Sequence, residues 1–246
     1  SPPQKQLCGL QLNSRRFPTN KIMSNKDSLI ISIELSQRNG TVAATMGEED
    51  IVEIPAIQGN REKDAVMPSL HQAVSRVGGN QNNIKTIYIS IGPGSFTGLR
   101  VAVATAKTIS FVTGASIVPV ETALGVVRAD VNAPEKSIVV SAVKKETCWL
   151  SVVTKEPKWI CEGRLVNTAE LPTYIERATV LYGDSFLPNN ISDICDEMDV
   201  PIKESCSTAT SILEVGQTLG YHPRVSAARL LPLYPREPEA VRKWKE

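Results

Sequence analysis

Short runs of apolar and β-branched residues alternate with turn residues from about residue 29 onward. The run Leu29–Glu34 is typical of a buried strand, and Thr41–Met46 follows it after Asn39-Gly40, a pair that favours a tight hairpin turn. Ile51–Ile54 predicts a third, shorter strand, and Thr86–Ile91 predicts a fourth. The pattern therefore predicts a sheet that begins with a hairpin.

Helical periodicity occupies the stretches between and after these strands. Apolar residues recur at helical spacing from Val66 to Val77, and Gly78-Gly79 then ends the helix. Pro68 predicts a kink in this helix or a late start. The next predicted elements are a helix to about Thr113 with Gly114 as its stop, the strand Ser116–Val120 and the helix Glu121–Ala129. The first half thus has the order βββαβαβα.

The second half repeats this beginning. Three strands are predicted at Ser137–Ala142, Cys148–Thr154 and Trp159–Leu165. Thr168 can cap a helix that runs through about Ala178, and the strand Val180–Tyr182 follows. The stretch Gly183–Pro201 is polar and interrupted, which predicts a loop, and Thr208–Leu219 predicts a final helix before Gly220.

Three strands followed by alternating helices and strands thus occur twice, which predicts an α/β fold with two βββαβαβα-type domains. This duplication is the layout of the actin-like ATPase fold, whose halves are ribonuclease H-like. The boundary falls near Asp130–Pro134. We therefore expect an N-terminal extension over residues 1–28, a first domain over 29–130 and a second domain with a C-terminal tail over 131–246.

A glycine-rich elbow joins the fourth strand to the helix that follows it. Its glycines permit a positive φ or the close approach of another group to the backbone, and its proline stiffens the turn. Ser95 or Thr97 can cap the helix by accepting a hydrogen bond from a free backbone N–H. The candidate residues of the elbow are Gly92, Pro93, Gly94, Ser95, Phe96, Thr97, Gly98 and Arg100.

The elbow matches neither of two well-known phosphate-binding motifs. A Walker A loop requires a lysine after its last glycine, whereas Leu99 and Arg100 follow Gly98. A dinucleotide fingerprint requires Gly-x-Gly-x-x-Gly, and the spacing here is one residue longer. A helix N-terminus alone contributes only about 0.3–1 kcal/mol to binding an anion. A structural elbow is the favoured interpretation, with a phosphate-contacting loop and a partner-contacting loop as alternatives.

Composition narrows the class of protein. The net charge of +1 over 246 residues gives no overall electrostatic sign of nucleic-acid binding and leaves only a local basic patch open. The absence of an 18-residue apolar run predicts no transmembrane helix. The five cysteines lack a Cys-x-x-Cys pair, which favours reduced, packed thiols in an intracellular, cytoplasmic protein. His71 and His222 lie far apart in the sequence, so no metal site is expected. No cofactor is expected either.

The first 26 residues differ from the rest because they are basic and contain no acidic residue. They lack the apolar core of a signal peptide. Met23 lies six residues before the first predicted strand, so we expect the native start at Met23 or an added leader before it. This extension is expected to be dispensable for folding.

Four segments resemble the TsaB family, also called YeaZ, of bacterial tRNA threonylcarbamoyladenosine biosynthesis. The elbow Gly92–Arg100 is similar to the signature of that family, and Leu29–Ser36 is similar to its opening strand. Ala142–Trp149 lies where the family has Asp-Ala-Lys/Arg-x-Gly-Glu-Val-Tyr, and Leu231–Ala240 resembles its closing Pro-x-Tyr-x-Arg segment. The resemblance spans about residues 29–240 and also implies the actin-like fold.

The resemblance implies a scaffold role without catalysis. The expected partners are TsaD, which would transfer the threonylcarbamoyl group to the adenosine beside the tRNA anticodon, and the ATPase TsaE. The chain in isolation is expected to form a homodimer, and strong direct binding of tRNA is not expected. The alternatives are an active ATPase or kinase of the actin-like superfamily, and a diverged homodimeric binding module outside tRNA modification.

Two positions depart from the chemistry of actin-like ATPases. The aspartate that closes the first strand and orients magnesium-bound water in that superfamily is replaced here by Glu34, whose side chain is one methylene longer. Ala142 occupies the matching position of the second domain, where TsaB relatives usually have aspartate, and alanine can neither ligate a metal nor act as a base. These eroded cleft positions favour a cleft without hydrolytic activity, and no catalytic residue is assigned.

Small residues recur at spacing four on the helix after the elbow, namely Gly98, Ala102, Ala106 and Ser110. Residues four apart share a helix face, and small side chains permit close helix packing. The face can pack against the sheet of its own domain or against a partner. The TsaB resemblance favours the partner, with Val66 and Leu70 of the preceding helix in the same interface.

Overall fold

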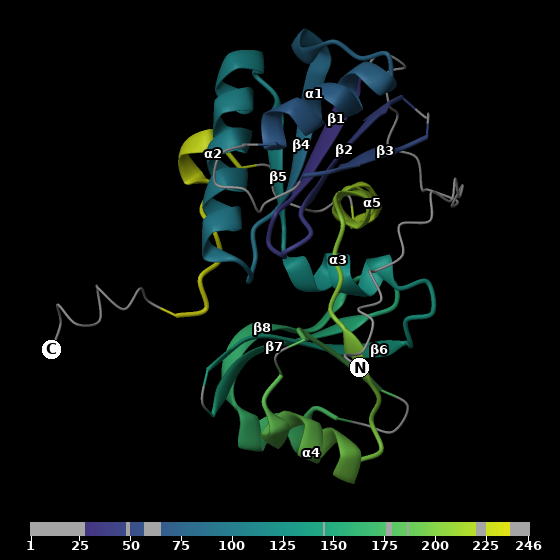
Figure 1. The fold of residues 1–246 in the computed structure, drawn as a ribbon, viewed down its shortest axis with the longest axis vertical. Coiled ribbons are helices and arrows are strands. Elements are labelled where there is room, and N and C mark those ends of the chain that lie inside the picture. The colour runs from purple at the N-terminus through teal and green to yellow at the C-terminus, as the bar shows by residue number, and fades with distance from the viewer. Residues whose placement is uncertain are drawn as a thin grey trace, which may run out of the picture.

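Two five-stranded sheets, joined by two central helices, form the described part of the protein (Figure 1). The computed structural model describes residues 28–47, 50–56, 65–144, 146–175, 179–185, 187–219 and 225–236. Residues 1–27, which form nearly all of the expected N-terminal extension, lie outside this part of the chain. The sheets have the orders β3-β2-β1-β4-β5 and β10-β9-β6-β7-β8, so the second repeats the first. This duplicated arrangement is the actin-like ATPase fold.

The first sheet follows the strand pattern of the sequence closely. Its elements are β1 (Leu29–Glu34), β2 (Thr41–Met46), β3 (Val52–Pro55), α1 (Val66–Arg76), the 3₁₀ turn η1 (Gln81–Asn83), β4 (Ile84–Ser90), α2 (Phe96–Thr113), β5 (Ser116–Val120) and α3 (Thr122–Ala129). β1 pairs antiparallel with β2 and parallel with β4. α1 begins at Val66, as the apolar pattern predicts, and not later. Pro68 stands in its first turn, where its missing N–H breaks no helical bond.

The second sheet has longer antiparallel strands. Its elements are β6 (Lys136–Lys144), β7 (Thr147–Thr154), β8 (Trp159–Asn167), the 3₁₀ helix η2 (Thr168–Thr173), β9 (Val180–Gly183), α4 (Asn189–Glu197), β10 (Ile202–Glu204), α5 (Ala209–Leu219) and the 3₁₀ turn η3 (Ala227–Arg229). β6 pairs antiparallel with β7 and parallel with β9, as β1 does with β2 and β4.

Three elements of the second half differ from the prediction, and one of them is the short strand β10, where no strand was expected. The helix expected from Thr168 is a 3₁₀ helix that ends at Thr173, and its cap is Asn167, which forms a capping box with Glu170. Pro172 has no N–H with which to extend it. The loop expected over Gly183–Pro201 contains α4, because Ile191, Ile194 and Cys195 have the i, i+3, i+4 spacing of an apolar helix face.

The last helix of each half lies between the sheets (Figure 1). α3 follows the first sheet but packs against β6 and β7, whereas α5 follows the second sheet but packs against β1, β2 and β4. The helices also pack against each other. At Gly216 a Cβ atom would lie 2.1 Å from the Tyr88 ring, so glycine lets α5 lie flat on β4. A shared core of α3, α5 and both sheets joins the two halves.

Candidate functional site

The elbow lies at the end of β4, as the sequence predicts. Ser95 caps α2, because its Oγ accepts a hydrogen bond from Gly98 N at 3.3 Å. Gly114 ends the helix with φ +73°, and its N–H donates to Ser110 O. The cap and the stop expected for this helix are therefore confirmed.

The backbone of the elbow binds other parts of the chain. Ser95 N donates to Ser36 O at 2.6 Å, and a Cβ atom on Gly94 would lie 2.2 Å from the same oxygen. Thr122 N donates to Gly92 O at 3.0 Å, which ties the elbow to the start of α3. The elbow therefore joins the β1–β2 turn, the β5–α3 turn and its own helix, as the structural interpretation of its sequence expects.

Glu34 is enclosed at the end of β1, with no exposed surface. Its Oε1 accepts hydrogen bonds from Ser36 N at 2.6 Å and Ser36 Oγ at 2.5 Å, and its Oε2 accepts one from Ser207 Oγ at 3.1 Å. Burial raises the pKa of the Glu34 carboxyl, while hydrogen bonds from Ser36 and other hydroxyls oppose that rise. A general base must reach a substrate proton directly or through water, and this carboxyl has no exposed surface.

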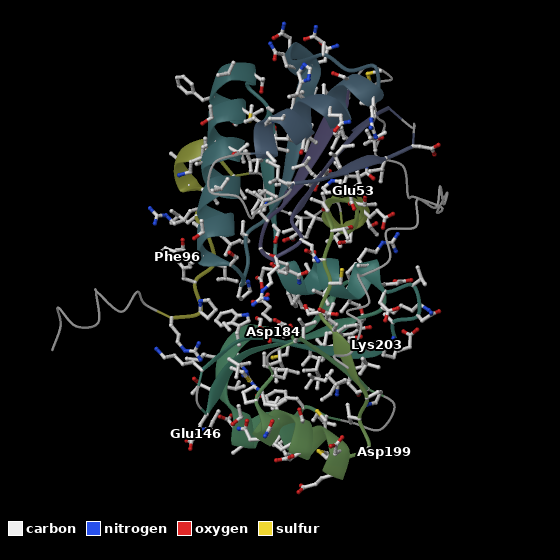
Figure 2. The ribbon with its side chains drawn as sticks, in the orientation of Figure 1. Glu53, Phe96, Glu146, Asp184, Asp199 and Lys203 are labelled. Carbon is white, nitrogen blue, oxygen red and sulfur yellow. The ribbon has the colours of Figure 1, made fainter. Side chains whose placement is uncertain are left out.

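Further hydrogen bonds hold the segment before α5 against the first sheet. Ser207 N donates to Gln37 Oε1 at 2.9 Å, and Gln37 Nε2 donates to Ser205 Oγ at 3.2 Å. The first amides of α5 follow, where Ala209 N and Thr210 N donate to Thr41 Oγ1 and Glu53 Oε2, both at 2.7 Å. Figure 2 shows Glu53 beside α5. We call these contacts, together with those of Glu34, the Glu34 latch.

Ala142 is part of a separate hydrogen-bond network. It lies within β6 with φ +49°, a left-handed conformation that is uncommon for a residue other than glycine. Its carbonyl oxygen accepts a hydrogen bond from Arg236 Nη1. Both eroded cleft positions thus contribute structural contacts, since Glu34 binds residues of the latch and Ala142 binds the C-terminal segment.

Glu121 is the other strongly perturbed carboxyl near the elbow. It precedes α3, and its Oε2 is buried with no hydrogen-bond partner among the described residues. Burial raises the pKa of Glu121 to about 7, and the nearby charge of Glu162 adds to the rise. The part of the chain that the structure describes contains no cluster of three or more His, Cys, Asp or Glu side chains that could hold a metal ion.

The small-residue face of α2 lies inside the first half, which corrects the expectation of a partner contact there. Ala102 and Ala106 have no exposed surface, and both belong to the core against the first sheet. The remaining expected interface residues are Gly98, Val66 and Leu70, which are buried, and Ser110, which is half-buried and donates its hydroxyl to Ala115 O at 2.7 Å. A helix on a sheet buries a stripe about 100° wide, so the small row is buried beside Leu99 and Val103.

The opposite face of α2 is exposed and largely without charge. Its residues follow a spacing of four and three along the helix, and they are Thr97, Val101, Ala104, Thr108 and Phe111. Phe111 is 89% exposed and its neighbour Val112 is 75% exposed. The sequence signal for this exposed face was the pair Phe111-Val112 just before the helix stop, because both residues lie outside the stripe that the helix buries. We call this set of residues the outer α2 face.

An aromatic cluster lies at the start of the same helix. Phe96, which is half exposed, packs on Tyr234 of the C-terminal segment with ring centroids 5.1 Å apart. The Arg100 guanidinium lies 5.2 Å from the centre of the Phe96 ring. Figure 2 shows Phe96 at the N-terminal end of α2, the end nearer the second half.

The TsaD family, described as tRNA N6-adenosine threonylcarbamoyltransferase, matches residues 53–164, somewhat less than half of the chain. Among solved structures, YeaZ from Pseudomonas aeruginosa superposes with a TM-score of 0.69 at 16% identity, covering 84% of this chain and 99% of that one. The chain has a YeaZ-like fold.

A second structure of the YeaZ-like fold gives the same result. It is described as an uncharacterized protein with similarity to peptidase YEAZ from Pseudomonas aeruginosa, with a TM-score of 0.70 at 17% identity, covering 85% of this chain and all of that one. No curated protein sequence matches significantly. The resemblance to TsaB is thus confirmed for the fold. Within the described residues, no helix has the length and apolar character needed to cross a bilayer.

Proposed function

We propose that this protein is a scaffold subunit, without catalytic activity of its own, in the formation of threonylcarbamoyladenosine on tRNA. Its partner would be a TsaD-like threonylcarbamoyltransferase, and a TsaE-like ATPase would complete the assembly. The observation that carries the proposal is the outer α2 face, an exposed helix surface without charged residues on a YeaZ-like fold. In isolation the same face would join two copies of the chain, and the expected location is the cytoplasm.

The Glu34 latch supports a role without hydrolysis. In an active cleft the carboxylate at this position would have to face water and a metal ion, whereas Glu34 is fully enclosed by residues of the β1–β2 turn and Ser207. Ala142 supplies no side-chain ligand on the other side. These features favour the scaffold over the ATPase or kinase alternative.

The chemistry of the outer α2 face supports a protein partner. Interfaces are enriched in aromatic residues and arginine, and depleted in acidic residues and lysine. Phe96, Arg100 and Phe111 are exposed on this helix, and the face between them carries small and β-branched side chains. The spacing of four and three suits packing against another helix.

The proposal is tested by calorimetric titration of the full chain with the TsaD-like protein of the same organism. We expect binding by the native chain. Phe111→Arg should weaken it at least about 30-fold, because truncating or charging an interface hot spot costs about 2 kcal/mol or more. Sedimentation of the isolated chain should show a dimer that the same substitution disrupts.

The control is Ile160→Arg, which changes a side chain on β8 of the second sheet that is 55% exposed. It should bind as the native chain does. Equal binding by Phe111→Arg and the native chain would place the partner surface elsewhere. If the native chain neither binds the TsaD-like protein nor alters its activity, the proposed function is wrong and the diverged binding module becomes the better account.

A further inference from the structure

The C-terminal segment Leu230–Arg236 contacts both halves of the protein. Leu230 is 1% exposed and belongs to the core of the first half. Three residues later, Leu233 N donates a hydrogen bond to Ile91 O at 2.7 Å, at the start of the elbow. The same segment passes beside α2 toward the second half (Figure 1).

Tyr234 and Arg236 extend these contacts in opposite directions. The Tyr234 ring packs on Phe96 of the elbow. Arg236 binds the β6–β7 hairpin, because its Nη2 donates to Thr147 O at 3.0 Å and to Thr147 Oγ1 at 2.6 Å, and its Nη1 donates to Ala142 O. The guanidinium, a planar fork of donors, therefore binds both strands of the hairpin at once.

The chain between the Leu233 and Arg236 contacts is short, so it permits little relative movement. Leu233 and Arg236 are three residues apart, so fully extended chain between them spans only about 10 Å. Pro235 lies within this stretch, and its ring fixes one of the few backbone dihedrals that could lengthen it. A shift of the hairpin away from the elbow must therefore break the contacts at one end.

We propose that Leu230–Arg236 is a tie that couples the elbow of the first half to the β6–β7 hairpin of the second, with Arg236 as its anchor. Loss of the contacts at either end makes the backbone at the other end more mobile. The elbow begins α2, so the tie holds the outer α2 face in one orientation relative to the second sheet. This last consequence rests on the proposed function, whereas the coupling itself does not.

The coupling is tested by hydrogen exchange on the full chain with Arg236→Ala. We expect exchange to rise about tenfold at the hairpin, where the contact is lost, and also at the elbow amides Ser95 and Gly98, which Arg236 does not touch. Exchange in α4 should stay unchanged. A rise confined to the hairpin would overturn the proposal, because Arg236 would then stabilise only its own binding site.

A reciprocal variant tests the other end of the tie. Tyr234→Ala removes the ring contact with Phe96 and should raise exchange at the hairpin residues Ala142 and Thr147. The double variant with Arg236→Ala should then exchange no faster than the more affected single variant. Effects that simply add would overturn the coupling.

Two further variants keep the test interpretable. Arg229→Ala removes an exposed arginine of η3 in the same part of the chain and should leave exchange at both ends as in the native chain. If Arg236→Ala fails to fold, Arg236→Lys preserves the charge but lacks the planar fork. It should show the same rise at both ends with a smaller amplitude.

The consequence for assembly is measured separately. If the native chain binds the TsaD-like partner, Arg236→Ala should weaken that binding about tenfold without a change on the outer α2 face itself. Equal binding despite faster exchange would show that the tie does not serve the partner surface. If the native chain does not bind the partner, the proposed function fails, and the exchange experiment alone then decides the coupling.

Discussion

At the scale of single residues, two buried carboxyls have altered acidity with no metal-binding cluster beside them in the described residues. Glu34 is hydrogen-bonded on both oxygens, whereas Glu121 has one buried oxygen without a partner among those residues. Burial raises the pKa of both side chains. Each therefore retains its proton in the folded state at a pH where the unfolded chain has released it.

This difference predicts a loss of stability as pH rises. Between the usual glutamate pKa of 4.5 and about 7, the folded chain binds more protons than the unfolded chain at Glu121, so the free energy of unfolding falls. The loss amounts to at most about 3 kcal/mol at 1.36 kcal/mol per pKa unit. Glu121→Gln should reduce this slope, leaving the part that arises from Glu34.

Urea denaturation at pH 5 and pH 8 measures the effect. The native chain should be less stable at pH 8 than at pH 5. At pH 8, Glu121→Gln should be more stable than the native chain. Glu162→Gln offers a matched comparison, because it removes only the secondary cause of the raised pKa and should change the slope slightly. An identical slope in the native chain and Glu121→Gln would contradict the assignment.

At the scale of elements, α2 has a buried face and an exposed face, and each of them carries an alanine. Ala102 has no exposed surface, whereas Ala104, two residues later, is exposed. Ala102→Arg should prevent stable folding, because an unpaired buried charge costs several kcal/mol. Ala104→Arg should change the melting temperature by no more than a few degrees, since exposed helical sites tolerate arginine well.

Circular dichroism and thermal melting of the two variants settle which face is inside. Normal folding of Ala102→Arg would mean that the small-residue face is accessible, and the expectation of a partner contact there would return. Loss of the fold with Ala104→Arg would mean that the packing of α2 described above is wrong.

The contact between α5 and β4 predicts a reversal of an ordinary substitution effect. Glycine to alanine inside a helix usually stabilises by roughly 1 kcal/mol. At Gly216 the new Cβ atom would lie 2.1 Å from the Tyr88 ring, so α5 would have to move off the sheet. Gly216→Ala should therefore destabilise by about 1–3 kcal/mol, as overpacked cores do.

Chemical denaturation measures this change in the free energy of unfolding. The double variant that combines Gly216→Ala with Tyr88→Ala tests its cause. The smaller side chain makes room, so Gly216→Ala should be much less harmful in that background than in the native chain. A stabilised Gly216→Ala variant would show that α5 does not lie flat on β4.

At the scale of the whole molecule, three features hold the two halves together. They are the helices α3 and α5, which pack on each other's sheets, the Glu34 latch and the C-terminal tie. Within the latch, the Glu34 carboxyl has no exposed surface. We therefore expect negligible magnesium-dependent ATP hydrolysis and weak nucleotide affinity. Glu34→Asp should not restore activity, because Ala142 still supplies no ligand and the shorter side chain remains enclosed.

Phosphate release by the native chain and Glu34→Asp provides the measurement. Turnover near the usual enzyme range of about 1–10³ s⁻¹, or calorimetric binding of ATP in the low micromolar range, would contradict the scaffold role. Either result would favour the ATPase or kinase alternative.

The sequence by itself determined the order of most elements, the duplicated layout, and the cap and stop of α2. These features depend on local periodicity and on residues such as Ser95 and Gly114, whose effect on the backbone is confined to one turn. The resemblance to TsaB also gave the correct fold. The helix α4 was missed because its apolar spacing is short and lies among polar residues.

Only the tertiary structure decided which face of α2 is buried, that α3 and α5 pack on each other's sheets, and how Arg236 binds Ala142 and Thr147. A periodic pattern shows that a helix has faces, but neighbouring rows of small and large residues fit a core equally well. Residues about ninety positions apart meet only when two sheets have packed. Such contacts depend on the shapes of both surfaces, which no local stretch of sequence contains.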